Sequence, residues 1–115
     1  MEIRTRQVEE VTVFDIEGRV IGRESVQLKQ AIDDVITSSA SAPKLLLNLA
    51  DVSMMDSSGV GTLVGAHLSV GRKGGRIGVV NVGTNIRSLL VMARIITVLE
   101  HFDSEEEAIK ALQSA

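Results

Sequence analysis

KLLLNLADVSMMDSSGVG, residues 44–61, is the stretch of sequence that decides the fold. Its first part, residues 44–49, is a short and nearly unbroken aliphatic run, which is typical of a β-strand buried on both faces. Its second part places Asp56 and Ser57 directly before apolar residues that recur at helical spacing from Val60 onwards. Asp and Ser are both good helix N-cap residues, so either one can cap this helix. The stretch therefore predicts a buried strand that leads through a polar turn into a helix.

The segments on both sides extend this unit into a layered α/β fold. Residues 3–8 and 11–16 alternate in polarity and are separated only by Glu9-Glu10, which predicts an antiparallel hairpin. Strands that alternate with helices need crossover connections, which favour a parallel sheet. The sequence therefore predicts a mixed, mostly parallel sheet with an N-terminal antiparallel hairpin and about four helices, in a single domain over residues 1–115. The remaining expected elements are helices whose apolar stripes lie within residues 24–36, 60–71 and 86–93, strands at 44–49, 76–81 and 95–99, and a last helix that starts at a Ser104/Glu107 capping box.

Composition excludes several functional classes. The chain has 115 residues, a formal net charge of -3, no Trp or Tyr, and only two Phe. Base stacking needs aromatic side chains and phosphate-backbone binding needs a basic surface, so no direct nucleic-acid partner is expected. The absence of Cys removes thiolate metal sites and fits a reducing compartment. A charged start without an apolar h-region, and the lack of an apolar stretch of ~20 residues, predict a cytoplasmic protein with no membrane span. Without Cys and with only two separated His, no metal site is expected.

Ser58 falls in the first turn of the helix that this pattern predicts. Backbone N–H groups there have no partner inside the helix. A phosphate on Ser58 would meet these donors and the positive end of the helix dipole, so the fold would tolerate it while its charge changed the outer surface. The same residues also fit ordinary helix capping, with Gly59 and Gly61 permitting close packing of helix on strand. The spacing alone leaves both interpretations open.

Two other kinds of site have weaker support. Gly59, Gly61 and Gly65 read G-x-G-x-x-x-G, one residue longer than the dinucleotide fingerprint, and keep nucleotide binding as an alternative. A serine hydrolase would need a general base and a nucleophile elbow, and G-x-S-x-G is missing. His67 falls on the apolar stripe of the predicted helix, and His101 follows the last predicted strand. Both are interpreted as packing or surface residues.

Residues 45–49, then Val52, then residues 55–61 resemble the core motif of STAS domains, and particularly of anti-sigma factor antagonists. In that family an aliphatic strand leads into a D-S-[ST]-G-[hydrophobic]-G turn. The resemblance covers almost the whole chain, from the glycine-containing exit at residues 18–22 to the final helix after Phe102. It departs at residues 93–95, Ala-Arg-Ile, where many relatives have a small residue or glycine before the last strand. The matching motif residues are Asp56, Ser57, Ser58, Gly59, Val60 and Gly61.

The resemblance implies a function exercised by binding, not by catalysis. The family's phosphoacceptor corresponds to Ser58, flanked by Asp56 and Ser57, although Ser57 stays open as the acceptor. Unphosphorylated, such a bacterial protein binds an anti-sigma factor that is itself a serine kinase, and a sigma factor is released. Phosphorylation breaks the complex and a serine phosphatase resets it. ATP and Mg²⁺ belong to the kinase, so no cofactor is expected.

Two alternatives to this function remain open from the sequence. One is a STAS scaffold or sensor component, or a lipid-transport subunit, without a sigma-factor role. The other is a small nucleotide-binding domain that uses residues 59–65. The oligomeric state is not determined by the sequence.

Overall fold

The computed structural model describes residues 1–113, so the last two residues of the predicted domain, 114–115, lie outside the described part. The described residues form five strands and four helices. In chain order these are β1 (Glu2–Val8), β2 (Val11–Val20), α1 (Arg23–Ser38), β3 (Lys44–Met55), α2 (Ser57–Arg72), β4 (Arg76–Val80), α3 (Thr84–Met92), β5 (Glu100–Phe102) and α4 (Glu105–Gln113).

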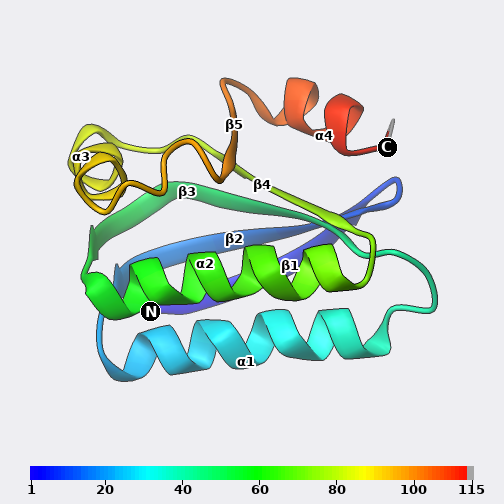
Figure 1. Cartoon of the computed structure of the whole chain (residues 1–115), viewed down its shortest axis with the longest axis horizontal. Coiled ribbons are helices and arrows are strands. Elements are labelled where there is room, and N and C mark those ends of the chain that lie inside the picture. Colours follow the sequence, from blue (N-terminus) through cyan, green and yellow to red (C-terminus); the bar gives the residue numbers. More distant parts are fainter. Residues whose placement is uncertain (114–115) are drawn as a thin grey trace.

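The strands form one sheet in the order β1-β2-β3-β4-β5. β1 pairs with β2 antiparallel, and every other neighbouring pair is parallel. Because parallel crossovers are right-handed, strands laid down in sequential order place their connecting helices on the same face of the sheet. Figure 1 shows α1 and α2 side by side on that face and α4 on the other. The predicted mixed α/β sheet with its N-terminal hairpin is confirmed.

Two apolar layers, one on each face of the sheet, hold the helices in place. Successive side chains of a strand point to opposite faces. In β2, Phe14 and Ile16 belong to the core under α1 and α2, whereas Val11 and Val13 belong to the core under α4. The aliphatic run of β3 divides in the same way, so residues 45–47 are buried on both faces, as predicted.

The last strand does not lie where the β-branched run predicts it. Residues 95–99 form turns, and β5 is the short segment Glu100–Phe102, paired with β4. Ile95 and Ile96 pack against the main core without joining the sheet. The β propensity of such side chains reflects how well they fit a half-buried surface, and a turn segment on the core offers that surface as well as a strand does. Arg94, at the departure from the family pattern, has φ 61, the left-handed conformation that glycine adopts most readily.

The buried face of α2 is rotated from the predicted stripe. Leu68 continues the helical spacing of apolar residues that starts at Val60 and is expected to be buried on that basis, but it is 51% exposed. Several residues of the buried face are small, and a pattern based on large apolar side chains does not detect them. Their small size lets α2 lie close to α1 and the sheet. The prediction of the helix was right, and the prediction of its apolar face was partly wrong. The buried residues are Gly59, Val60, Thr62, Leu63, Ala66 and Val70.

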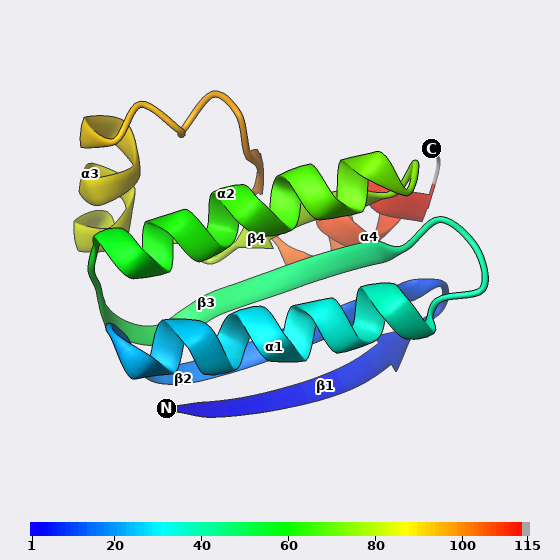
Figure 2. The same ribbon diagram turned by 60° about the horizontal axis from the view of Figure 1, so that its bottom comes forward.

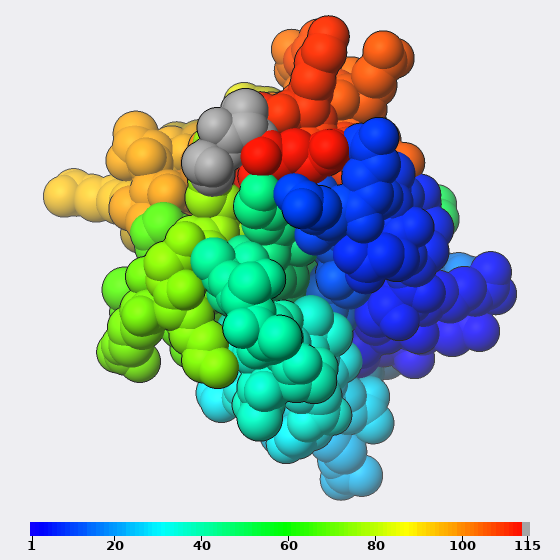
Figure 3. All heavy atoms as spheres, turned by 90° about the vertical axis from the view of Figure 1, so that its right-hand side faces the viewer, coloured from blue at the N-terminus to red at the C-terminus, as the bar shows by residue number. Residues whose placement is uncertain are grey.

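Arg6 ties α4 to the N-terminal hairpin. Its guanidinium donates to Asp15 Oδ2 in β2 at 2.6 Å and to Glu105 Oε2 in α4 at 2.9 Å, and Figure 3 shows α4 in red against the blue hairpin. The hydrogen bonds from Arg6 are the main reason that the pKa values of Asp15 and Glu105 lie below their ordinary range. The arrangement therefore joins β1, β2 and α4 through one cation.

Arg6→Gln is expected to destabilise the fold in a pH-dependent way. Because both carboxyl groups have a lower pKa folded than unfolded, their stabilisation is present above the unfolded values near ~4 and is lost as the pH falls through the folded values. All three side chains are about a third exposed or more, so the loss at neutral pH should be only about 1 kcal/mol. Urea unfolding from about pH 7 down to about pH 2.5 measures it, and the wild-type and variant curves should converge at acid pH.

Arg4→Gln provides a graded comparison, because Arg4 lies on the same strand, is 73% exposed and forms its ion pair with Glu2, while its charge is the smallest of the causes that lower the pKa of Asp15. Its loss of stability at neutral pH should be clearly smaller than that of Arg6→Gln, and it should also vanish at acid pH. A deficit in Arg6→Gln that stayed constant from neutral to acid pH would contradict the assignment to the two carboxylates.

Candidate functional site at the N-termini of two helices

The motif lies where two helices begin at the same end of the molecule. β2 ends at Val20 and β3 ends at Met55, and these residues are neighbours in the parallel register. α1 and α2 start immediately afterwards, side by side (Figure 2). In α/β sheets this edge, beyond the carboxyl ends of parallel strands, is where ligands and partners are usually met. The topology therefore brings the segment at residues 20–25 against the motif at 56–59.

Asp56 is the N-cap of α2. Its Oδ1 accepts from the N–H groups of Ser58 at 3.0 Å and Gly59 at 3.1 Å, which satisfies two of the unpaired donors of the first turn. Its Oδ2 accepts from the N–H of Gly22 at 3.2 Å, so the same carboxylate also holds the start of α1. Of the two cap candidates in the sequence, Asp56 is the one the structure uses.

The Ser58 hydroxyl lies at the centre of a hydrogen-bonded cluster. It donates to Asp56 Oδ1 and accepts from the N–H of Gly22 at 3.1 Å. Its oxygen is 2.8 Å from the hydroxyl oxygen of Ser25, a residue of α1 that is only 2% exposed. Thr62, one turn further along α2, donates to the carbonyl oxygens of Ser25 and Ser58. Ser58 as a residue is nevertheless exposed, so the cluster is reachable from solvent.

The six motif residues predicted from the sequence separate into two groups. Asp56, Ser57 and Ser58 lie at the surface end of α2, and Ser57 makes no side-chain hydrogen bond within residues 1–113. Gly59 and Val60 are buried in the core side of the helix, and Gly61 is exposed. The motif thus combines a polar site with the packing that holds it.

Three partners of Ser58 were not predicted as site residues. They are Gly22, Ser25 and Thr62. A serine early in one helix and a threonine inside the next are common residue types, and no spacing connects them to Ser58. Only Gly22 could be noticed in the sequence, as the last glycine of the segment at residues 18–22 that follows the second strand. Its φ of 51 is the left-handed conformation that allows its N–H to turn toward α2.

The carboxyl group of Asp56 is stabilised in its charged form. The hydrogen bond from the Ser58 hydroxyl is the main cause that lowers its pKa, followed by the backbone N–H groups of Gly59, Gly22 and Ser58. A group with a depressed folded pKa stabilises the protein above its unfolded pKa and loses this effect as the pH falls through the folded value. The site therefore holds an ionised acceptor at neutral pH.

Asp56→Asn is expected to lower the thermal midpoint at neutral pH, because an amide accepts the N–H bonds of α2 less strongly than a carboxylate does. The difference from the wild type should shrink once the pH falls low enough to protonate Asp56 in both states. Thermal unfolding followed by circular dichroism across this pH range measures it. Asp51→Asn, at an exposed carboxylate of β3, is the control. A midpoint difference independent of pH would contradict the role of the charge.

The alternative sites that the sequence suggested take other places in the fold. Gly59, Gly61 and Gly65 all lie inside α2, so they do not form the turn before a helix that cradles a dinucleotide. His101 lies in the edge strand β5, where burial, and then Arg87, lower its pKa against the opposing effect of a backbone hydrogen bond at Ile96. Within those residues no group of three or more His, Asp or Glu side chains is placed to hold a metal ion.

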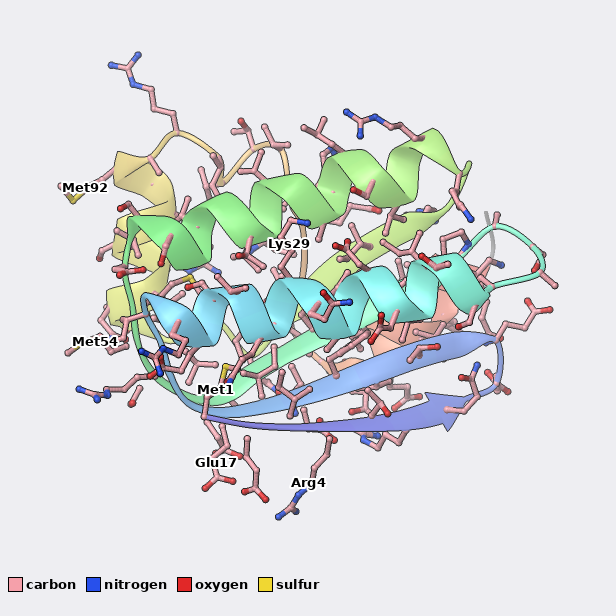
Figure 4. All side chains as sticks on the ribbon, turned by 90° about the horizontal axis from the view of Figure 1, so that it is seen from below. Met1, Arg4, Glu17, Lys29, Met54 and Met92 are labelled. Carbon is pink, nitrogen blue, oxygen red and sulfur yellow. The ribbon has the colours of Figure 1, made fainter. Side chains whose placement is uncertain are left out.

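An exposed apolar rim flanks the Ser58 end. Met54, near the end of β3, is 50% exposed, and Met92, at the end of α3, is 81% exposed. Both point away from the body of the protein at the end where α1 and α2 begin (Figure 4). Asn85 of α3 donates to the carbonyl oxygen of Ser53, which fixes α3 beside this end of β3. Flexible, exposed methionines are favoured at surfaces that bind other proteins.

None of the helices within residues 1–113 has the length and apolar character needed to cross a lipid bilayer.

Comparison with known proteins gives one consistent family. The family model for the STAS domain matches residues 2–108. The anti-sigma F factor antagonist of Paenibacillus polymyxa is 25% identical over 103 residues, which cover 90% of this chain and 87% of that protein. The solved structure of the anti-sigma factor antagonist SpoIIAA in its unphosphorylated form has a TM-score of 0.77 and 24% identity, and covers 99% of this chain and 100% of its own.

A second solved structure shows the phosphorylated form of SpoIIAA, described as a Bacillus cell fate determinant. It has a TM-score of 0.73 and 23% identity, and covers 96% of this chain and 98% of its own. At these identities the two structures establish a shared fold. Because the family model spans nearly the whole sequence, this chain belongs to the STAS domain family.

Proposed function

We propose that this protein is an anti-sigma factor antagonist that works by binding in the bacterial cytoplasm. Unphosphorylated, it binds an anti-sigma factor that is also a serine kinase, and the sigma factor is released. Phosphorylation of Ser58 breaks the complex and a serine phosphatase restores it. The observation that carries the proposal is the hydroxyl of Ser58, an exposed residue at the junction of two helix N-termini, which is hydrogen-bonded to a carboxylate.

The surroundings of Ser58 accommodate a phosphate without unfolding the protein. The N-termini of α1 and α2 both bring the positive ends of their dipoles to this site, and the N–H of Gly22 is directed at the Ser58 oxygen. The neighbouring carboxylate of Asp56 opposes a second negative charge, so the phosphate is favoured on the outer side. A dianion there changes the binding surface far more than it changes the core.

Ser58 is a better acceptor than Ser57 on the same grounds. The hydrogen bond from Ser58 to Asp56 points its proton at a base and orients its oxygen. Ser57 has no such side-chain partner within residues 1–113. The exposed Met54 and Met92 nearby supply apolar contact area for the partner. The relatives named as anti-sigma factor antagonists, one of them solved in both phosphorylation states, support the proposal of a phosphorylation switch in general.

Phosphopeptide and intact-mass analysis of the protein from its native cells tests the switch. We expect a population heavier by one phosphate that persists in Ser57→Ala and disappears in Ser58→Ala. If no phosphate is found under any growth condition, the switch is wrong, and a constitutive STAS scaffold or transport subunit becomes the better account. Phosphate that is lost in Ser57→Ala instead would move the acceptor by one residue.

Pairwise two-hybrid tests against each anti-sigma factor kinase of the same organism address the partner. One kinase should bind the wild type and Ser58→Ala, and the pair should then be confirmed by calorimetry with purified proteins. Calorimetry of the isolated protein with ATP tests the nucleotide-binding alternative, for which saturable heat would be required.

A further inference from the structure

The Ser58 hydroxyl has no free hydrogen-bonding capacity. A serine hydroxyl has one proton to donate and two lone pairs to accept with. The ionised Asp56 can only accept, so the proton of Ser58 points to Asp56. The backbone N–H of Gly22 can only donate, and it occupies one lone pair. The hydroxyl of Ser25 must then be the donor in the 2.8 Å contact, and it occupies the other.

A saturated hydroxyl cannot act as a nucleophile as it stands. In phosphoryl transfer a lone pair of Ser58 forms the new O–P bond to the terminal phosphorus of a nucleoside triphosphate. The bridging P–O bond breaks, the nucleoside diphosphate leaves with that electron pair, and the serine proton passes to Asp56 or to a base of the kinase. One of the two hydrogen bonds that Ser58 accepts must break before this attack.

The two bonds differ in what their loss leaves behind. The N–H of Gly22 also faces Asp56 Oδ2 at 3.2 Å, so it keeps an acceptor when Ser58 turns away. Ser25 is 2% exposed, and within residues 1–113 its hydroxyl has no other hydrogen-bond partner. Loss of the hydrogen bond from Ser25 to Ser58 would leave this buried hydroxyl unpaired, which costs more free energy than loss of the bond from Gly22. The bond from Ser25 is therefore the one that resists the movement of Ser58.

The helix pair holds this bond in register. Thr62 Oγ1 lies 3.1 Å from the carbonyl oxygen of Ser25 and 3.2 Å from that of Ser58, and Thr62 is itself buried. The backbones of the two serines are thus fixed to one another through one side chain. The hydrogen bond between the two serine hydroxyls therefore has to break by rotation of the Ser58 side chain, because α1 and α2 do not separate without breaking the Thr62 contacts.

We propose that Ser25 is a latch on Ser58: its buried hydroxyl holds the Ser58 oxygen turned into the site and limits how fast Ser58 reacts. The role in phosphorylation rests on the proposed function, whereas the latch itself is a property of the isolated protein. Ser25 touches neither nucleotide nor phosphorus in this scheme and acts only through Ser58. Removing its hydroxyl should speed the reaction, the opposite of what an orienting residue would show.

Thiol alkylation tests the latch without any kinase. The chain has no cysteine, so Ser58→Cys provides a single thiol at the site. Its alkylation by iodoacetamide should be about tenfold faster when combined with Ser25→Ala, which corresponds to about 1.4 kcal/mol. Rates across a pH series separate this effect from a change in the thiol pKa. Combination with Ser69→Ala, a half-buried serine further along α2, should leave the rate unchanged.

Phosphorylation by the kinase identified above, with ATP and Mg²⁺, provides the second arm. Ser25→Ala and Ser25→Cys should take up phosphate several-fold faster than the wild type, and Ser25→Thr, which retains a hydroxyl, should stay close to it. Thermal unfolding verifies that each variant is folded. If no kinase phosphorylates the wild type, the proposed function fails while the alkylation rates still decide the latch. Equal or slower reaction after Ser25→Ala would overturn the latch.

Discussion

Ser58→Glu is expected to weaken binding of the anti-sigma factor by at least about 100-fold, or about 2.7 kcal/mol. The substitution removes the hydroxyl that bonds Asp56 and Gly22, and it adds a second negative charge beside Asp56. Like charges brought together at an interface, and a carboxylate stripped of water there, both oppose the complex. Calorimetric titration of the purified kinase with each variant measures the effect.

Two variants control this result. Ser58→Ala removes the same hydrogen bonds without the charge and should bind within a few-fold of the wild type. Ser57→Glu places the charge one residue earlier, at a side chain without hydrogen bonds within residues 1–113, and should weaken binding less. Equal affinity of Ser58→Glu and Ser58→Ala would show that charge at this position does not control the complex.

Gly59→Ala is expected to lower the free energy of unfolding by about 2 kcal/mol, although alanine is the better helix former. A Cβ atom at Gly59 would lie 2.5 Å from Met55 Cγ and 2.8 Å from the carbonyl oxygen of Val20. The methionine can turn aside, but the backbone of β2 cannot without disturbing the sheet. The clash should therefore displace α2 away from β2 and take Ser58 with it. Urea unfolding at neutral pH measures the loss.

Gly61→Ala supplies the matched control two residues along the same helix. A Cβ atom there meets nothing within 4 Å, so the variant should gain up to about 1 kcal/mol from helix propensity alone. Opposite signs at the two glycines are the expected result. If both substitutions stabilised the protein, the close approach of α2 to β2 would be wrong.

The order of the elements followed from the sequence because its local patterns agree with the final packing. The aliphatic run at residues 45–47 is buried on both faces, and Asp56 caps the helix that follows it. The last strand was misplaced for a physical reason. Residues 95–99 are the more β-like by composition, but register with β4 favours Glu100–Phe102. Local β propensity does not indicate which segment lies in position to pair with the neighbouring strand.

The site was only half predictable for a related reason. Asp56 and Ser58 are close in sequence and belong to one capping pattern, so spacing alone places them together. Ser25 and Gly22 reach Ser58 only because parallel β2 and β3 end side by side, 33 and 36 residues away along the chain. The order and direction of the strands create these contacts, and the spacing of residues along one sequence does not predict them.

The bond between Arg6 and Glu105 spans 99 residues of sequence, and this separation has a consequence for biosynthesis. The hairpin leaves the ribosome first, yet the helix that covers its second face is made last. Until α4 arrives, Val11, Val13 and Leu46 have no apolar cover on that side of the sheet. The nascent chain therefore passes through a state in which this apolar face of the sheet is exposed. Slow translation of the segment that encodes α4 should increase its dependence on chaperones.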